Sequence, residues 1–282
     1  MAKVFCIDVG RCSGCYNCQF ACKDEHCGNE WLPYAKMQPM TGQFWLKMEE
    51  HINGTRPKVK MHFIPKLCNH CDDPACVKAG TDGAVYKRED GLVIIDPVKA
   101  KGQRQIAQAC PYGAVYWNEE LDIPQKCTGC AHLLEEGCSP RCVDVCHTGA
   151  IQFGEEEEFS KFISEAIVMN PESGCGPRVY YKNIPGQFIA GTVYDPEEEI
   201  VIKNAVCILN GRGEQRKVYT DTFGDFWFKD LKKGVYELDI RAEGFADLKF
   251  RDLDTSEKCI NLGDIPMGKI TVPEGENRHD NL

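Results

Sequence analysis

The sequence predicts an α+β protein in which a cysteine-rich N-terminal domain with few regular elements precedes an all-β sandwich. Two observations lead to this prediction. All the closely spaced cysteines lie before about residue 155, in loops rich in Gly, Pro, Asp and Asn. From about residue 186 the chain changes to short segments that alternate between apolar and polar residues, which is typical of half-buried strands. The expected divisions are a cysteine-rich domain at 1–155, a connecting helix and loop at 156–185, a seven-stranded sandwich at 186–270 and a polar tail at 271–282.

The first block of cysteines, residues 12–22, has the spacing C-x2-C-x2-C-x3-C. Bacterial ferredoxins have this spacing, and in them the fourth cysteine binds the other cluster of a pair. Twelve of the eighteen cysteines in the 282-residue chain fall into such groups, so we predict a ferredoxin-like domain in which [4Fe–4S] clusters replace much of the hydrophobic core. A small aliphatic core is expected from segments such as Leu92–Ile95. The later groups are Cys68-x2-Cys71-x4-Cys76, Cys110, and Cys127-x2-Cys130-x11-Cys142-x3-Cys146.

Disulfides and zinc sites fit these cysteines less well. Disulfide-dense scaffolds are usually small and secreted. The pairs Cys68/Cys71 and Cys127/Cys130 have the spacing of zinc ligands, but four cysteines within residues 12–22 would crowd adjacent tetrahedral zinc ions. The six other cysteines are interpreted as small buried or surface thiols, with Cys138 kept as a possible ligand: Cys6, Cys27, Cys138, Cys175, Cys207 and Cys259.

The region after the cysteine loops predicts one short helix and then strands. Apolar spacing over 159–167, directly after the acidic run at 155–158, indicates the helix, and a loop rich in Pro and Gly follows at 170–177. Regularly spaced short strands favour a β-sandwich or barrel. We expect the strands near 188–194, 205–209, 216–222, 226–228, 235–240, 245–250 and 259–265. No clustered His, Asp or Glu set is found there, so we interpret this half as a structural or docking module.

Composition excludes several functions. A net charge of −10 argues against a nucleic-acid surface. No apolar stretch reaches the length of a membrane span, and residues 1–6 show no secretory or twin-arginine signal. We therefore expect a cytoplasmic protein, unless a partner that carries a signal exports it. We find no nucleophile–base pair, phosphate-binding glycine loop or pterin-binding signature, and predict no catalytic residues on this chain.

Several motifs in a shared order make residues 1 to about 182 resemble the iron–sulfur subunits of the dimethyl-sulfoxide-reductase superfamily of molybdenum enzymes. They are C-x2-C-x2-CQFACKDEH (12–26), CNHCDDPAC (68–76), KREDGLV (87–93), CPYGA (110–114) and VYY (179–181). The resemblance implies ligands that cross over between blocks. It assigns Cys12, Cys15, Cys18 and Cys146 to a first cluster, Cys22, Cys127, Cys130 and Cys142 to a second, and Cys68, Cys71, Cys76 and Cys110 to a third. Cys138 is the alternative to Cys142, which is favoured because its spacing to Cys146 matches the family.

The resemblance also implies that one cluster is missing. The ligands of the family's fourth cluster would stand at Gly80, Ala100, Gln103 and Ile106, and none of these can bind iron through a thiol. In the family this cluster faces a membrane subunit, so no membrane anchor subunit is expected here. A chain with this loss and a C-terminal β-domain is most similar to the small subunits of a transhydroxylase or of catechol dehydroxylases. The β-domain itself resembles transthyretin-like or carboxypeptidase-regulatory-like sandwiches.

The function that the resemblance implies is electron transfer within a heterodimer. A large partner subunit would hold bis-molybdopterin guanine dinucleotide with molybdenum or tungsten. That partner would carry out hydroxyl transfer or dehydroxylation on polyhydroxylated aromatics. Two alternatives stay open: the relay subunit of another molybdenum reductase, such as one acting on an oxyanion, and a freestanding polyferredoxin. The β-domain argues against a diffusing carrier, which does not need it.

Charged and histidine side chains flank the ligands. The cations are Arg11, Lys23, Lys66 and Lys126, and the histidines are His26, His70, His132 and His147. Such cations are either ordinary solvated charges or a means of raising cluster potential, because a positive charge favours the more negative reduced state. The histidines are interpreted either as residues without a role at the clusters or as hydrogen-bond partners that tune the cluster potential, since each cluster already has four cysteines.

Overall fold

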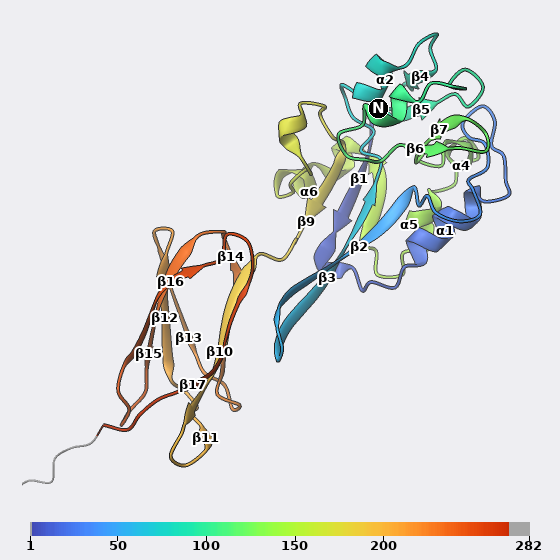
Figure 1. The fold of residues 1–282 in the computed structure, drawn as a ribbon. Helices are drawn as coiled ribbons and strands as arrows, with labels where there is room; N and C mark the ends of the chain where they lie inside the picture. Colours follow the sequence, from blue (N-terminus) through green and yellow to red (C-terminus); the bar gives the residue numbers. More distant parts are fainter. Residues whose placement is uncertain (1, 271–282) are drawn as a thin grey trace, which may run out of the picture. The chain divides into compact units, whose positions relative to one another are not determined.

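The computed structural model describes residues 2–270 and divides the chain into two compact units (Figure 1). The first unit contains the chain up to His51 and His62–Ile184. The second contains Ile52–Met61 and the chain from Pro185 onward. This division differs from the expected one in two respects: residues 156–184 belong to the first unit, and the tip of a long hairpin belongs to the second. The predicted tail at 271–282 lies outside the described residues.

A three-stranded sheet of order β8-β1-β9 brings both ends of the first unit together. Strand β1 (Lys3–Asp8) pairs antiparallel with β8 (Ile151–Glu155) and parallel with β9 (Val179–Lys182). The expected connecting segment therefore ends in a strand of this sheet. Its predicted helix is split into a 3₁₀ turn, η2 (Glu156–Phe159), and a short α-helix, α6 (Ser160–Ser164).

The rest of the first unit consists of short helices and two-stranded ladders between the cysteine loops. The helices are η1 (Val9–Arg11), α1 (Asn17–His26), α2 (Ala75–Ala79), α3 (Gln105–Gln108), α4 (Ala131–Glu135), α5 (Arg141–Asp144) and η3 (Pro171–Ser173). The ladders are β2 (Leu46–Thr55) with β3 (Lys58–Leu67), β4 (Val85–Lys87) with β5 (Val93–Ile95), and β6 (Tyr116–Asn118) with β7 (Ile123–Gln125).

The hydrophobic core of the first unit contains cysteines as well as apolar side chains. Phe5, Ile7 and Leu46 pack in one cluster with the buried thiols of Cys18, Cys22, Cys68, Cys127 and Cys142. The predicted aliphatic core at Leu92–Ile95 is fully buried, and none of its four residues is more than 5% exposed. Short helices and strands are enough to enclose this core because the cysteine loops themselves surround it.

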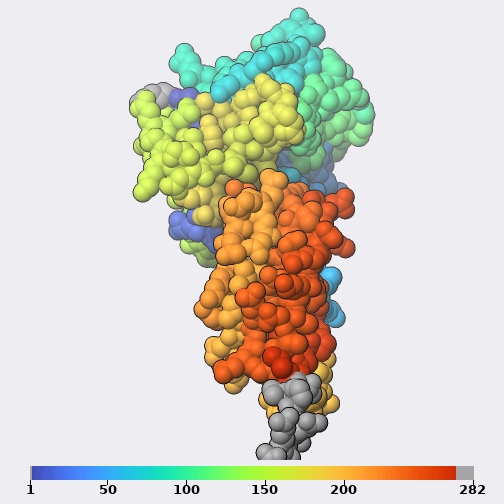
Figure 2. Space-filling view, turned by 90° about the vertical axis from the view of Figure 1, so that its left-hand side faces the viewer, coloured from blue at the N-terminus to red at the C-terminus, as the bar shows by residue number. Residues whose placement is uncertain are grey.

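The second unit is a sandwich of two four-stranded sheets, in keeping with the predicted α+β class (Figure 1). In the space-filling view its surface is coloured from orange to red (Figure 2). Its inner residues, such as Ile189, Phe226, Leu238 and Ile240, are at most 1% exposed and form one core. The predicted segments correspond to all strands except β11, which is too short to show alternation. One sheet contains β10 (Gln187–Asp195), β11 (Ile200–Val201), β14 (Asp225–Leu231) and β17 (Ile260–Pro266). The other contains β12 (Val206–Gly211), β13 (Glu214–Tyr219), β15 (Val235–Arg241) and β16 (Leu248–Asp254).

The tip of the β2–β3 hairpin is part of the second unit through specific contacts. The side-chain amide of Asn261 on β17 donates to the carbonyl of Thr55 at 3.0 Å. The buried ammonium of Lys58 pairs with the carboxylate of Asp225. No helix in residues 2–270 has the length and apolar character needed to span a membrane.

Candidate metal centres

The first group of thiols lines one cavity at the ends of two helices. Cys12 and Cys15 precede α1, Cys18 lies in its first turn, and Cys146 follows α5. Burial raises the pKa of Cys18 to about 12, and the neighbouring thiols of Cys12, Cys146 and Cys15 add to this rise. Cys15 is exposed, so this group reaches the surface of the first unit.

The second group consists of Cys22, Cys127, Cys130 and Cys142, each at most 7% exposed. Burial raises the pKa of Cys142 well above its usual value, and the thiols of Cys130, Cys127 and Cys22 raise it further. These mutual effects show that the four side chains lie together. The alternative residue, Cys138, is exposed and its thiol lies 4.0 Å from the carbonyl of Glu136, apart from this group.

The third group, Cys68, Cys71, Cys76 and Cys110, lines a separate cavity, which Cys175 also lines. Cys76 lies in α2 and Cys110 follows α3, so two short helices position these two thiols. Two cavities thus contain eight of the twelve predicted ligands, and the four buried thiols of the second group lie between other core side chains. The assignment of each set of four to one cluster stays a prediction.

The three groups form a row. Cys18 and Cys22 lie one turn apart on α1 and contribute to the first and second groups respectively. Cys127 of the second group and Cys68 of the third belong to one buried cluster of side chains. Burial is the main cause of the raised pKa of Cys127, and the nearby Cys68 thiol is the next. Electron carriers bound at these sites would therefore be neighbours in the order first, second, third.

The arrangement of the thiols fits iron–sulfur clusters. The thiols of the first and third groups surround small cavities, as a four-iron cube with a thiolate at each corner iron requires. One cysteine of each group also accepts a backbone N–H bond that would stabilise a bound thiolate: Ile151 to Cys146 at 3.5 Å, Gly129 to Cys127 at 3.4 Å and His70 to Cys68 at 3.5 Å.

A glycine at residue 14 lets the first cysteine loop turn. Gly14 has a φ of +68°, and a Cβ there would lie 2.4 Å from the ring of Phe63. Both the left-handed backbone and the close ring exclude a larger residue.

The place of a fourth cluster is closed by side-chain packing. Ala100 and Ile106 are 0% exposed and pack with Val85, Val93 and Ile95. A Cβ at Gly80 would lie 3.0 Å from Val85 and 3.5 Å from Ile106, so this position belongs to the same packed region. The side chain of Gln103 bonds to the neighbouring loop, since its Oε1 accepts the backbone N–H of Thr81 at 2.9 Å. The four positions that lack ligands therefore surround an apolar core or bond to neighbouring backbone.

A buried lysine lies between the second and third groups. Lys126 is 2% exposed, and its ammonium donates to the carbonyls of Cys127, at 3.0 Å, and Val93. Burial raises the pKa of Cys76 to about 11, and the Lys126 charge opposes that rise. Of the cations that flank the ligands, Lys126 is thus placed to act on bound clusters rather than on solvent.

Replacing Lys126 with Met will lower the midpoint potentials of the second and third clusters. A unit charge roughly 8 Å away contributes about 2 kcal/mol at an effective dielectric constant of about 20. For a one-electron couple about 59 mV corresponds to a tenfold change in the equilibrium constant, so we expect a fall of about 90 mV. Redox titration followed by electron paramagnetic resonance (EPR) measures the change.

Lys66→Met is the matched control, because Lys66 also precedes a ligand loop but is 44% exposed and pairs with Glu49 at 2.7 Å. Its effect should be small, since exposed pairs are screened by water. Equal shifts in the two variants would refute a special role for Lys126.

The histidines beside the loops make ordinary polar contacts or ring contacts. His70 accepts the backbone N–H of Val93 at 3.0 Å through Nδ1. His132 contacts Glu25 at 3.1 Å and stacks on Trp31 with ring centroids 4.3 Å apart. Burial lowers the pKa of His26 to about 3, and its ring packs against Trp45. His147 approaches Cys15 at 3.9 Å.

Sequence reasoning missed Arg178, which anchors the third group. Its side chain is 7% exposed and bonds Asp72 at 3.2 Å and Glu156 at 2.9 Å. Asp72 follows Cys71 directly, so Arg178 links the ligand loop to the segment after β8. Its position just before the VYY motif was the available signal, but its partners are about 20 and 100 residues away.

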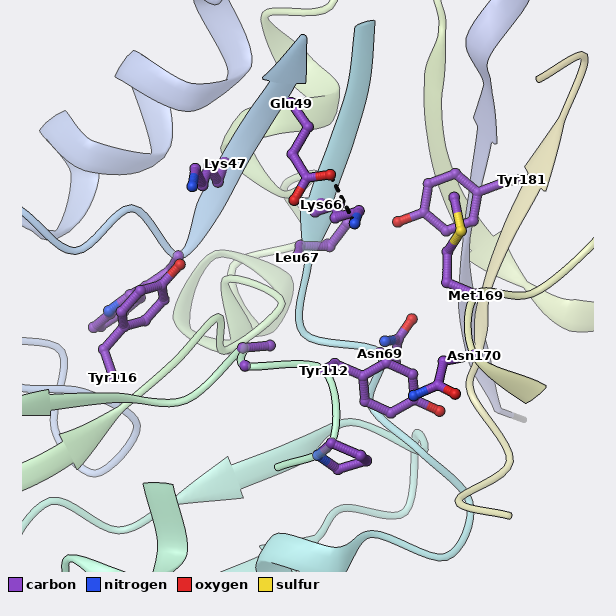
Figure 3. Close-up of a pocket in the computed structure, with 14 residues that line it drawn as sticks. Lys47, Glu49, Lys66, Leu67, Asn69, Tyr112, Tyr116, Met169, Asn170 and Tyr181 are labelled. Atoms are coloured by element: carbon purple, nitrogen blue, oxygen red, sulfur yellow. Dashed lines mark ion pairs between the residues drawn. The ribbon is translucent and has the colours of Figure 1, made fainter. Parts of the chain in front are cut away.

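A groove of about 480 Å³ opens beside the third group (Figure 3). Figure 3 shows the ion pair of Lys66 and Glu49 at one side and the rings of Tyr112 and Tyr181 at another. Asn69 lines both this groove and the third cavity, and its side-chain Oδ1 has no hydrogen-bond partner among the described residues. The third group therefore lies close to a polar, accessible surface.

Comparison with known proteins identifies the family. Residues 59–156 match the 4Fe-4S dicluster domain, and residues 189–265 match the carboxypeptidase regulatory-like domain. The chain is 38% identical to the pyrogallol hydroxytransferase small subunit of Pelobacter acidigallici over 281 residues, which cover 93% of this chain and 97% of that protein. This chain is a member of the iron–sulfur subunits of the dimethyl-sulfoxide-reductase superfamily of molybdenum enzymes. The family predicted from the motifs is confirmed.

Other members of this family match a smaller share of the chain. A tetrathionate reductase subunit from Salmonella typhimurium is 34% identical, over 65% of this chain and 73% of that protein. One chain of the anaerobic dimethyl sulfoxide reductase of Escherichia coli is 38% identical, over 59% of this chain and 80% of that protein. The chain is thus an iron–sulfur electron-transfer subunit.

Proposed function

We propose that this chain holds three [4Fe–4S] clusters and transfers electrons to or from a molybdopterin-containing catalytic subunit. The observation that carries the proposal is the gathering of twelve cysteines into three separate groups in one unit of the fold. The first cluster would be bound by Cys12, Cys15, Cys18 and Cys146, and the second by Cys22, Cys127, Cys130 and Cys142. The third would be bound by Cys68, Cys71, Cys76 and Cys110. When bound, the clusters supply one-electron transfer.

The protein's own residues contribute position and environment to this transfer. Burial of the second group excludes water, and the backbone N–H donors to Cys146, Cys127 and Cys68 stabilise thiolates. Cys15 is exposed, so we propose that the catalytic subunit docks over the first group. Electrons would then pass along the row of three sites.

The proposed partner is a large subunit with bis-molybdopterin guanine dinucleotide and molybdenum or tungsten, in a heterodimer. The relative that is matched over 97% of its own length, β-sandwich included, is named a pyrogallol hydroxytransferase small subunit. This full-length similarity favours hydroxyl transfer or dehydroxylation on polyhydroxylated aromatics. No substrate-transforming residues are proposed on this chain.

The closed fourth site supports an assembly without a membrane subunit. Apolar packing of Ala100 and Ile106 takes the place where the family places its fourth cluster. We propose that the complex exchanges no electrons with membrane quinones and resides in the cytoplasm. The sandwich, which we propose has a transthyretin-like topology, would act as a docking module.

A second function, electron relay for an oxyanion-type reductase, is favoured by the tetrathionate reductase relative at 34% identity. It differs from the first in the partner and not in the ligands. The catalytic assay of the native complex decides between the two functions.

The test is metal analysis of the complex purified without oxygen from its source. The proposal predicts about twelve irons for this chain, at four per cube, with about one molybdenum or tungsten and a large co-purifying subunit. Turnover of pyrogallol-type substrates, without reduction of tetrathionate, supports the aromatic function. Twelve irons without molybdenum, tungsten or a partner would instead indicate a freestanding carrier.

A further inference from the structure

The cavity of the third group contains five thiols, one more than a cluster needs. Cys175 is 7% exposed and lines it together with Cys68, Cys71, Cys76 and Cys110. Asn69, which is 4% exposed, lines the same cavity, and its side-chain Oδ1 has no hydrogen-bond partner among the described residues. The site therefore has more donor atoms than the four predicted ligands supply.

The segment that carries Cys175 is attached to both ligand loops of this group. The backbone N–H groups of Asp72 and Asp73 donate to the carbonyls of Gly176, at 2.7 Å, and Cys175, at 3.0 Å. The hydroxyl of Tyr112, in the Cys110 loop, lies 2.7 Å from that of Ser173. Three hydrogen bonds thus hold the segment 173–176, which carries Cys175, beside the cavity.

Cys175 lies on the Cys71 side of the cavity. Asp72 and Asp73, which donate to the carbonyls of Gly176 and Cys175, are the two residues that directly follow Cys71, so the Cys175 segment lies against this part of the loop. By contrast, two other non-ligand cysteines lie in strands outside the ligand loops, Cys6 in β1 and Cys207 in β12.

We propose that Cys175 is a reserve ligand of the third cluster, able to bind the iron that Cys71 otherwise holds. The inference rests on the proposed presence of that cluster. In the exchange the Fe–Sγ bond to Cys71 breaks and one to Cys175 forms, while the thiol proton of Cys175 passes to the freed Cys71 thiolate. No electron is transferred, and the cluster keeps four thiolates. An iron corner that loses its ligand would be recaptured instead of released.

Four forms of the chain, each purified with its partner subunit, test the inference by iron and sulfide content and by EPR. They are the wild type, Cys71→Ala, Cys76→Ala and the double variant Cys71→Ala/Cys175→Ala. Cys71→Ala should keep the wild-type iron content of about twelve, whereas the double variant should lose one to four irons. Cys76→Ala tests whether the exchange is confined to the iron that Cys71 holds, and it should lose iron. Equal losses in Cys71→Ala and the double variant would overturn the proposal.

The single variant Cys175→Ala covers the case in which Cys71→Ala does not fold. It should contain about twelve irons. It should release iron to a ferrous chelator about tenfold faster than wild type, which is the low end of the effects seen when a residue that supports a metal site is removed. An unchanged release rate would contradict the reserve role. A wild-type chain with fewer than about twelve irons would instead count against the three-cluster function itself.

Discussion

With the proposed three clusters bound, Cys110→Ala should remove about four of roughly twelve irons and leave the first and second clusters in place. Cys110 is the one cysteine that its loop contributes to the third group. Cys175 is bonded through its backbone to the residues after Cys71, so we expect it to replace Cys71 and not Cys110. Iron and acid-labile sulfide analysis, together with the EPR signals of the remaining clusters, measures the loss.

Cys207→Ala serves as the control for this variant. Cys207 is 0% exposed in the core of the sandwich, so its removal should leave iron content unchanged. Full iron content in Cys110→Ala would mean that the third cluster is assigned to the wrong residues. Loss of all three clusters would mean that the sites do not assemble independently.

Cys142→Ala and Cys138→Ala, four residues apart, should have opposite outcomes. Cys142 is buried among the thiols of Cys130, Cys127 and Cys22, so its removal should cost the second cluster, about four irons. The second site lies in the middle of the row, so electron transfer from the third cluster to the first should also stop. Cys138 is exposed, and its replacement should keep full iron content and full transfer.

Rapid-mixing reduction of the heterodimer, combined with iron analysis, measures both effects. If Cys138→Ala lost the cluster and Cys142→Ala kept it, the loop would use the alternative ligand that its sequence left open. The comparison is sharp because the two variants remove the same side chain from the same loop.

The spacing of the cysteines was enough to predict cluster-binding loops, because such loops are local, whereas the crossed sets of four came from the family resemblance. Three corners of a cube are held by a loop of about ten residues, and that spacing is readable without knowledge of the fold. The strands of the second unit were predictable for a similar reason. Alternation over a few residues, as in 235–240, reports one buried and one exposed face.

Features that depend on distant contacts were not predictable. Strand β9 pairs with β1 across more than 170 residues, and nothing in its four residues indicates that partner. Cys175 shows no ligand spacing because it reaches the third cavity through bonds to Asp72 and Asp73, about 100 residues earlier. Tertiary packing, rather than spacing, places these residues.

The sequence by itself determined which residue types could bind iron, how they group along the chain, and that Gly80, Ala100, Gln103 and Ile106 could not complete a fourth set. Only the tertiary structure decided which thiols share a cavity, that Cys142 rather than Cys138 is buried with its group, and that Lys126 lies between two sites. The physical reason is that thiol chemistry belongs to single residues and short loops. Burial and proximity, in contrast, arise from the packing of segments that lie far apart in the sequence.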